Sequence, residues 1–182
     1  MIIRNRLGFT LIELLVVIVI IGLLAGIGIA SFSGSIDRAK IAELQSHVDE
    51  ISLAAKRYFL DTGSWPPNYR LTNTLNPFTT NPSVSGWSGP YIDPWSAAHP
   101  WEGHIGWAVY DADGDGDTDT AIVLDDDRPG TTSTDNGGII PLDTMIAIDK
   151  TFDDGNLATG NVRGNGLGFG AAAGELVILV RL

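Results

Sequence analysis

An unbroken apolar run near the N-terminus is the feature that most constrains how this chain can fold. Residues 14–36 contain no charged side chain, and Glu13 is the only charged residue within positions 9–36. At 1.5 Å per residue the run forms about 34 Å of helix, which is enough to cross a bilayer. Residues 1–8 precede it with two arginines and no acid, as is typical of a membrane-targeting start. The sequence therefore predicts a hydrophobic transmembrane or assembly helix over residues 9–36.

Hydropathy alone leaves other interpretations of this run open. It also fits an uncleaved membrane anchor, or a secretory signal that is cleaved near Ala30. The order of the signals favours a different processing site, because Gly8 follows the basic residues and directly precedes the sequence FTLIE. The polar cleavage signal thus lies before the apolar run, whereas in a secretory signal it lies after the run. We interpret residues 1–8 as a leader peptide.

Past the apolar run, the pattern becomes amphipathic over residues 37–62. Apolar side chains recur there at spacings of three and four, which predicts that the helix continues and packs one face on a folded domain. We expect it to end near residues 61–63, because Pro66 and Pro67 cannot continue a helix. The apolar positions are Ile41, Leu44, Val48, Ile51, Ala55 and Tyr58.

Residues 63–182 are expected to form one globular domain, which makes the fold class α+β. The stretch 64–103 has little periodicity and several tryptophans, so we expect a long loop anchored by aromatic side chains in preference to a carbohydrate platform. Four short β-like runs predict a small antiparallel sheet. They lie near residues 104–111, 119–125, 144–149 and 175–182. Residues 155–174 are rich in Gly, Asn and Ala, and we expect a loop that adds nothing to the core.

The distal part of the chain is strongly acidic. Residues 61–182 carry five basic and seventeen acidic side chains, a net charge of about −12. Such a surface repels phosphate backbones, which argues against nucleic acid as a partner, and it favours cations. The chain has no cysteine, which excludes disulfides and cysteine-ligated zinc. It also lacks a P-loop, a dinucleotide fingerprint and a nucleophile elbow, and the histidines of HPWEGH lack zincin spacing, so we expect no enzyme activity.

An array of aspartates at residues 111–119 is the strongest metal signal. Side-chain oxygens at positions 1, 3, 5 and 9, with a backbone carbonyl at position 7, are suited to wrap a calcium ion. Position 12 holds Ile122 and not the glutamate of an EF-hand, so the array resembles calcium loops found between strands. A solvated acidic turn is the alternative. The expected ligands are Asp111, Asp113, Asp115, Asp117 and Asp119.

Two further acidic groups leave the number of metal sites open. Each of them either contributes to a metal site or is a solvated charged face, which is the commoner role of such a run. The groups are Asp125, Asp126 and Asp127, and Asp149, Asp153 and Asp154.

A family resemblance begins at Gly8. The sequence GFTLIELLVVIVIIGLLA at positions 8–25 resembles the class III signal of type IV pilins and type II secretion pseudopilins. The resemblance implies that a prepilin peptidase cuts between Gly8 and Phe9 and that Phe9 becomes a methylated N-terminus. It implies a fold in which a long hydrophobic helix packs on a small antiparallel sheet with long loops. It also implies an inner-membrane subunit, with its globular domain outside the cytoplasm, that an assembly platform builds into a homopolymeric filament.

Glu13 has two interpretations. With Thr10 it has the spacing of a capping box, in which Glu13 bonds back to the start of its own helix. The resemblance implies instead that Glu13 pairs with the Phe9 ammonium of a neighbouring subunit. A carboxylate at the start of a lipid-spanning helix is costly unless it is paired or near the interface, which either arrangement satisfies.

A weaker resemblance selects among the relatives. DTGSWPP at 61–67 and WSGPYIDPW at 87–95 look like the helix end and following loop of major pseudopilins, which bind calcium as a family. Ser96 departs from that pattern, which continues with glycine, and the C-terminal part is longer than expected. We expect the major pseudopilin of a type II secretion system, in a periplasmic filament. The alternatives are a type IV pilus or other surface pilin for adhesion, motility or DNA uptake, and a membrane-anchored calcium-dependent binding protein that does not polymerise.

Overall fold

The structure is a computed structural model that describes residues 9–70, 75–112, 115–130, 136–166 and 172–180, with the backbone alone at residues 28–34. The chain divides into two compact units, Met1–Ala39 and Lys40–Leu182. Along the described residues, a long helix is followed by two strands, a short helix and two further strands. This combination of helices and separate strands confirms the α+β class.

The long helix, α1, spans Leu11–Thr62 and contributes residues to both units. Leucine, isoleucine, valine and alanine dominate its sequence, and no proline interrupts its 52 residues. It ends where Gly63 adopts a φ of +74°, a conformation that favours glycine, and donates its N–H to the Phe59 carbonyl at 2.8 Å. The predicted length and end of the helix are confirmed.

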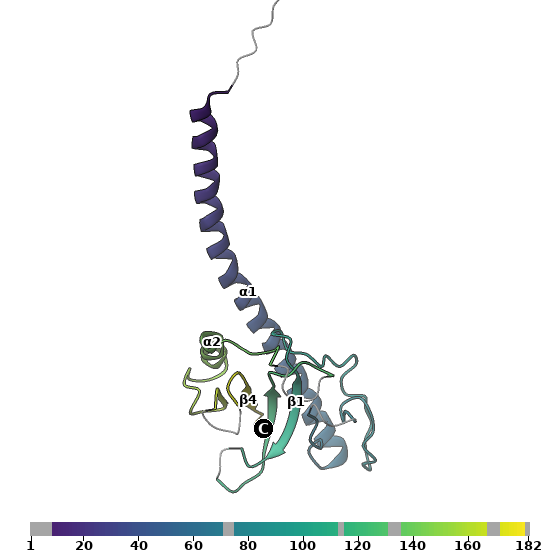
Figure 1. Ribbon diagram of the computed structural model, residues 1–182. Helices are drawn as coiled ribbons and strands as arrows, with labels where there is room; N and C mark the ends of the chain where they lie inside the picture. The colour runs from purple at the N-terminus through teal and green to yellow at the C-terminus, as the bar shows by residue number, and fades with distance from the viewer. Residues whose placement is uncertain (1–8, 71–74, 113–114, 131–135, 167–171, 181–182) are drawn as a thin grey trace, which may run out of the picture. The chain divides into compact units, whose positions relative to one another are not determined.

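A four-stranded antiparallel sheet lies in the second unit (Figure 1). Its strands are β1 (Ile105–Tyr110), β2 (Asp119–Leu124), β3 (Val162–Gly164) and β4 (Leu176–Leu179), in the order β1-β2-β4-β3. Trp107 pairs with Ile122, and Ile122 pairs with Ile178. Ile178 pairs in turn with Val162, so one row of buried apolar side chains crosses all four strands.

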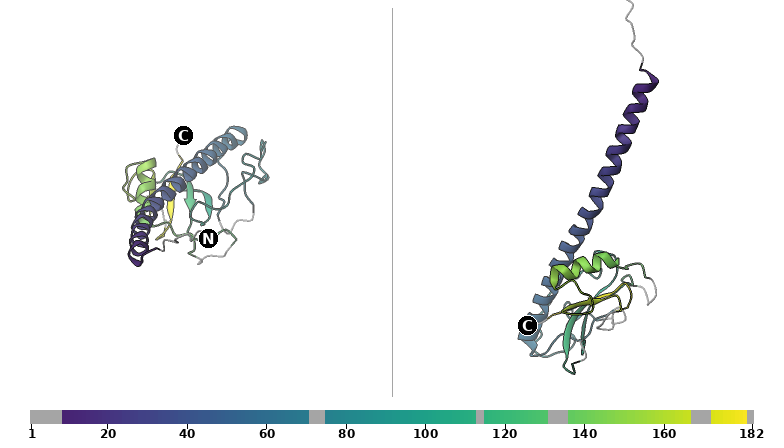
Figure 2. Two further views of the ribbon diagram at one scale, coloured as in Figure 1. Left: turned by 90° about the horizontal axis from the view of Figure 1, so that it is seen from above. Right: turned by 90° about the vertical axis from the view of Figure 1, so that its left-hand side faces the viewer.

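The main core of the second unit lies on the face of the sheet that carries this row. The part of α1 within this unit and the short helix α2 (Leu142–Phe152) both contribute to it, and α2 lies beside the β3–β4 end of the sheet (Figure 2). A smaller cluster that includes Ala108, Ala121 and Leu179 forms on the other side of the strands. The α1 positions predicted from the apolar spacing are buried or half-buried: Ile41, Leu44, Val48, Ile51, Ala55 and Tyr58.

Aromatic side chains anchor the long segment between α1 and β1, as predicted. Phe78 stacks on Trp95 with ring centroids 5.4 Å apart and lies edge-on to Trp107 at 5.7 Å. Trp107 donates its Nε1–H to the Pro66 carbonyl at 3.0 Å. Phe78 and Trp107 are fully buried, so the rings hold the loop to the core of the second unit.

The expectation of a strand at residues 144–149 is wrong, because these residues lie inside α2. The buried positions of α2 are Thr144, Met145, Ile148 and Asp149, a spacing that follows helical and not strand periodicity. Asp143 lies in the first turn and Lys150 in the last turn, where each complements the helix dipole. A short apolar run does not distinguish a strand from one buried face of a helix.

The expectation that residues 155–174 add nothing to the core is also wrong for the part that the structure describes. Val162 begins β3 and is fully buried, and Leu157 is 4% exposed. Both belong to the main core. Two bulky residues are therefore sufficient to join this segment to the core, because β3 pairs with an edge of β4. Residues 167–171 lie outside the described part of the chain.

Candidate assembly surface and acidic clusters

The start of α1 is organised by a reciprocal cap between Thr10 and Glu13. The Thr10 N–H and the Thr10 hydroxyl both donate to Glu13 Oε2 at 2.8 Å, and the Glu13 N–H donates to Thr10 Oγ1 at 3.3 Å. This is the predicted capping box. Both side-chain bonds use the same carboxylate oxygen, and among the described residues Glu13 Oε1 accepts no hydrogen bond. Capping therefore leaves one oxygen of Glu13 available for a second partner.

The first unit presents a long series of exposed apolar side chains. Those from position 9 to position 27 are between 49% and 89% exposed. A contiguous apolar surface of this extent marks a site that other apolar groups cover. The side chains are Phe9, Leu11, Ile12, Leu14, Leu15, Val16, Val17, Ile18, Val19, Ile20, Ile21, Leu23, Leu24 and Ile27.

Two sequence predictions at this end of the chain reach beyond the described residues. Gly8, the predicted cleavage position, lies outside them, and so do the side chains of residues 28–34 within the predicted apolar span. Among the described residues, no helix combines the length and apolarity needed to cross a membrane.

The predicted calcium loop connects β1 to β2, and Asp119 is the first residue of β2. Its carboxylates accept backbone N–H groups: Asp111 Oδ2 from Gly116 at 3.1 Å, and Asp119 Oδ2 from Ala112 at 3.1 Å. Asp115 Oδ1 accepts the N–H of Asp117 at 2.9 Å. Asp113 lies outside the described residues. Among the four described aspartates of the loop, no three have carboxylate oxygens within 4.8 Å of one another. Calcium at this loop stays a prediction.

Two other acidic groups do come together in space. In each, one carboxylate oxygen from every member lies within 4.8 Å of the others, which is close enough to hold a metal ion. The first, directly after β2, contains two aspartates that are only 8% exposed, and burial raises the pKa of Asp126, as do the charges of Asp125 and Asp127. The members are Asp125, Asp126 and Asp127 in one group and Asp149, Asp153 and Asp154 in the other.

The burial of Asp149 was missed in the sequence. Its signal is the helical spacing of α2, in which Asp149 lies four residues after Met145 on the buried face. A strand at residues 144–149 places alternate side chains on opposite faces and hides this pattern. Helical periodicity, applied to residues 142–152, places the Asp149 carboxylate on the buried face.

His99 has a structural position and no catalytic partner among the described residues. The His99 side chain is 2% exposed. The Trp101 N–H donates to His99 Nδ1 at 3.2 Å, so the ring proton lies on Nε2. His99 Nε2 donates in turn to the Asp125 carbonyl at 3.0 Å. Burial lowers the pKa of His99 to about 4, against an opposing effect of the Asp125 carbonyl. The ring is therefore neutral at pH 7 and ties the loop before β1 to the end of β2.

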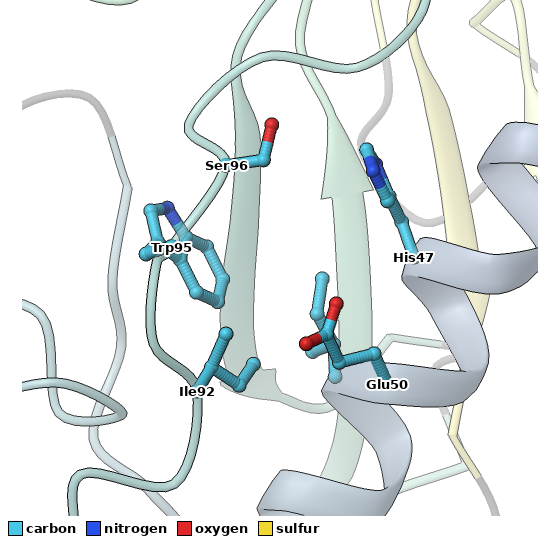
Figure 3. Close-up of a pocket in the computed structure, with 6 residues that line it drawn as sticks. His47, Glu50, Ile92, Trp95 and Ser96 are labelled. Atoms are coloured by element: carbon cyan, nitrogen blue, oxygen red, sulfur yellow. The ribbon is translucent and has the colours of Figure 1, made fainter.

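A small pocket in the second unit is too narrow for a substrate. It is lined in part by His47, Ile92, Trp95 and Ser96, and Figure 3 shows His47 and Trp95 on opposite sides of it. Its volume of about 10 Å³ suits one water molecule, far below the roughly 300–1,000 Å³ of ligand sites. Within the described residues, His47 Nδ1 and Trp95 Nε1 have no hydrogen-bond partner, which suits a bound water.

Two family models match the chain. Residues 3–29 match the prokaryotic N-terminal methylation motif, and residues 35–122 match the C-terminal model of PilW. The first match includes Gly8, the predicted cleavage position, and the Thr10–Glu13 cap.

Curated relatives include secretion proteins and pilins. The type II secretion system core protein G of Xanthomonas campestris pv. campestris is 34% identical over 131 residues, which cover 71% of this chain and 85% of that protein. The core protein G of Pseudomonas aeruginosa is 31% identical over 99 residues, or 50% of this chain and 70% of that protein. The type IV major pilin protein PilE1 of Neisseria gonorrhoeae is 34% identical over 70 residues, which cover 38% of this chain and 42% of that protein. No solved structure matched the chain.

The family matches and the described fold indicate the same kind of protein. A methylation signal leads into a capped apolar helix, and the same helix ends in a domain with a small antiparallel sheet. The match to the Xanthomonas protein spans more residues than α1 contains, so it extends into the domain. The chain thus belongs to the type IV pilin and type II secretion pseudopilin family, a non-enzymatic structural family of filament subunits.

Proposed function

We propose that this protein is the major pseudopilin of a type II secretion system. The observation that carries the proposal is the 131-residue match to a core protein G, which includes 85% of that relative. The match to the gonococcal pilin is 70 residues long and is little longer than the 52-residue helix. Likeness to core protein G thus extends over more of this chain, and over more of the relative, than likeness to the gonococcal pilin.

Assembly in this proposal uses the N-terminal unit. Prepilin peptidase cuts between Gly8 and Phe9, and the new Phe9 amine is methylated. The apolar side chains of residues 9–27, which are exposed in the single chain, are then covered by the same side chains of neighbouring subunits. Glu13 Oε2 remains in its own helix cap, and Oε1 neutralises the Phe9 ammonium of a neighbour.

The location follows from the same processing. Before assembly, the N-terminal helix is held in the inner membrane with the globular domain outside the cytoplasm, and an inner-membrane platform adds the subunit to a periplasmic homopolymer. The acidic domain, with a net charge of about −12 over residues 61–182, forms the outer surface. Calcium at residues 111–119 braces the β1–β2 connection there, because a cation offsets the repulsion of closely spaced aspartates.

An in-frame deletion in the source bacterium tests the proposal. Exoproteins of the secretion system should accumulate in the periplasm, measured by fractionation and immunoblotting, while surface fibres seen by electron microscopy remain. A plasmid copy of the intact chain should restore secretion. Normal secretion with loss of surface fibres would instead identify a surface pilin, and a subunit that never sediments as a polymer would identify a non-polymerising membrane-anchored binding protein.

A further inference from the structure

Asp149 is a buried carboxylate that the described structure leaves uncompensated. Its side chain is 0% exposed, and among the described residues neither Oδ1 nor Oδ2 has a hydrogen-bond partner. Burial raises the pKa of Asp149, and the charges of Asp154 and Asp153 raise it further; the nearby Gly155 N–H opposes this but makes no hydrogen bond of normal geometry. Buried polar groups in proteins are nearly always paired, so a missing partner is expected.

Asp153 and Asp154 bring two more carboxylates to this buried one. One oxygen from each of the three aspartates lies within 4.8 Å of the others. Calcium binds oxygens at 2.3–2.6 Å, so two oxygens on one ion can be up to about 5 Å apart. Magnesium binds at 2.0–2.1 Å, which limits the separation to about 4 Å. Three oxygens within 4.8 Å of one another are thus near the reach of one calcium ion, and small side-chain rotations are enough to bring them onto it.

The loop that follows α2 holds the two outer carboxylates in place. Asp154 Oδ1 accepts the Asn156 N–H at 2.7 Å, and Asp154 Oδ2 accepts the Thr159 hydroxyl at 2.9 Å. Asp153 Oδ2 accepts the N–H of Asn161. Each of these oxygens has a further lone pair for a cation. The loop ligands are thus oriented in advance, while Asp149 enters from the helix.

The three aspartates have no cationic partner in the described part of the chain. Within the described residues, neither a lysine nor an arginine nor a histidine forms an ion pair with Asp149, Asp153 or Asp154. Three carboxylates this close repel one another, and Asp149 is shielded from water. A hard divalent cation supplies both the missing charge and the missing partner for the buried oxygens.

We propose that Asp149, Asp153 and Asp154 form a second calcium site, separate from the loop at residues 111–119. The bound ion joins the C-terminal end of α2 to the segment that leads into β3, so it fixes the position of that edge strand in the sheet. The site lies within the second unit, and it does not depend on whether the filament serves secretion or a surface pilus.

Calcium titration of the full chain tests this site. The chain is purified in detergent micelles, stripped with chelator and titrated with calcium chloride by isothermal calorimetry. Asp113→Ala plus Asp115→Ala serves as the background, because it removes two predicted side-chain ligands of the loop at residues 111–119. In that background we expect one bound calcium per chain. Asp149→Asn and Asp154→Asn should each weaken binding at least about tenfold, because each removes a charged ligand.

Asp143→Asn is the matched control, since Asp143 is an exposed aspartate on the same helix. It should bind calcium as the background does. No calcium binding by the background, or equal binding by the control, Asp149→Asn and Asp154→Asn, overturns the proposal. Magnesium that binds as tightly as calcium overturns the choice of ion. Asp154 is exposed, so Asp154→Asn decides the question if Asp149→Asn does not fold.

Thermal melting separates a ligand from a merely structural aspartate. In chelator, Asp149→Asn should melt at a higher temperature than the background, because it removes an uncompensated buried charge. In calcium the order should reverse. A variant that melts lower than the background to the same extent in both conditions shows a packing role only, and contradicts the site.

Discussion

Glu13 has two roles that a single substitution can separate. Glu13→Gln keeps an oxygen that can accept the Thr10 N–H, so the helix cap and the cleavage at Gly8 should survive. It removes the negative charge that the proposed pairing with a neighbour's Phe9 ammonium requires. We expect a processed, membrane-inserted subunit with most filaments lost, measured by electron microscopy and immunoblots of sheared or sedimented polymer.

Thr10→Val is the control for the cap. It removes the hydroxyl that bonds Glu13 Oε2 at 2.8 Å but leaves the Glu13 charge, so filaments should form. A correctly processed Glu13→Gln subunit that polymerises at wild-type yield would show that Glu13 is a helix cap and nothing more.

His99 should make the domain sensitive to acid. Its pKa is lowered by burial from 6.5 to about 4, so between these values the unfolded chain binds a proton that the folded chain does not. The contribution of His99 to stability is therefore fully present above pH 6.5 and is lost as the pH falls toward 4, by up to about 3 kcal/mol. Chemical denaturation at pH 7 and pH 4.5 measures it.

The comparison variant is His99→Gln, because carboxylates also titrate below pH 5. This variant should be less stable at pH 7, since it disturbs the bonds to Trp101 and Asp125, but it should lose less stability on acidification than the parent. Parallel pH profiles for the two proteins would mean that His99 is not the titrating group.

At the level of elements, α2 shows why short apolar runs are ambiguous. Residues 144–149 have an apolar content that suits either a strand or a helix. Within the described sheet, β4 already pairs with β2 on one side and β3 on the other, so a strand from this segment would need an outer edge. The segment instead packs its Met145 and Ile148 side chains on the core as a helix.

The β1–β2 connection carries an element-level prediction about calcium. A ligand that binds only the folded state stabilises it by about 2.7 kcal/mol at a hundredfold excess over Kd. Calcium should therefore raise the melting temperature of the full chain in micelles relative to chelator. Asp113→Ala plus Asp115→Ala should lose the share of this shift that the loop supplies, whereas Asp143→Asn should keep all of it. An identical calcium response in all three proteins would remove the loop as a site.

At the scale of the whole molecule, processing should define the mature subunit. Cleavage after Gly8 leaves 174 of the 182 residues, beginning at a methylated Phe9. Intact-mass spectrometry of protein from the source organism should show the mass of this 174-residue chain with one added methyl group. Gly8→Val should block cleavage, because the added side chain changes the residue at the scissile bond, and should leave Met1 in place. A wild-type chain that retains Met1, or that begins near Ser31, would contradict pilin-type processing.

The sequence by itself was sufficient for features that depend on neighbouring residues. The signal around Gly8, the cap of Thr10 and Glu13, the length of α1, and strands β1, β2 and β4 all follow from local spacing and from a stop at glycine and proline. The same local patterns, with the family resemblance, were enough to identify a pilin-like subunit. Periodicity over a long helix repeats often enough to be unambiguous.

Only the tertiary structure decided what short segments do. It made residues 144–149 a helix, brought Leu157 and Val162 into the core, and buried Asp149 beside Asp153 and Asp154. The physical reason is that a segment of a few residues gains too little from its own periodicity to choose a conformation. Its choice depends on the sheet edge or core surface that it meets, and that surface is built from residues far away in the chain.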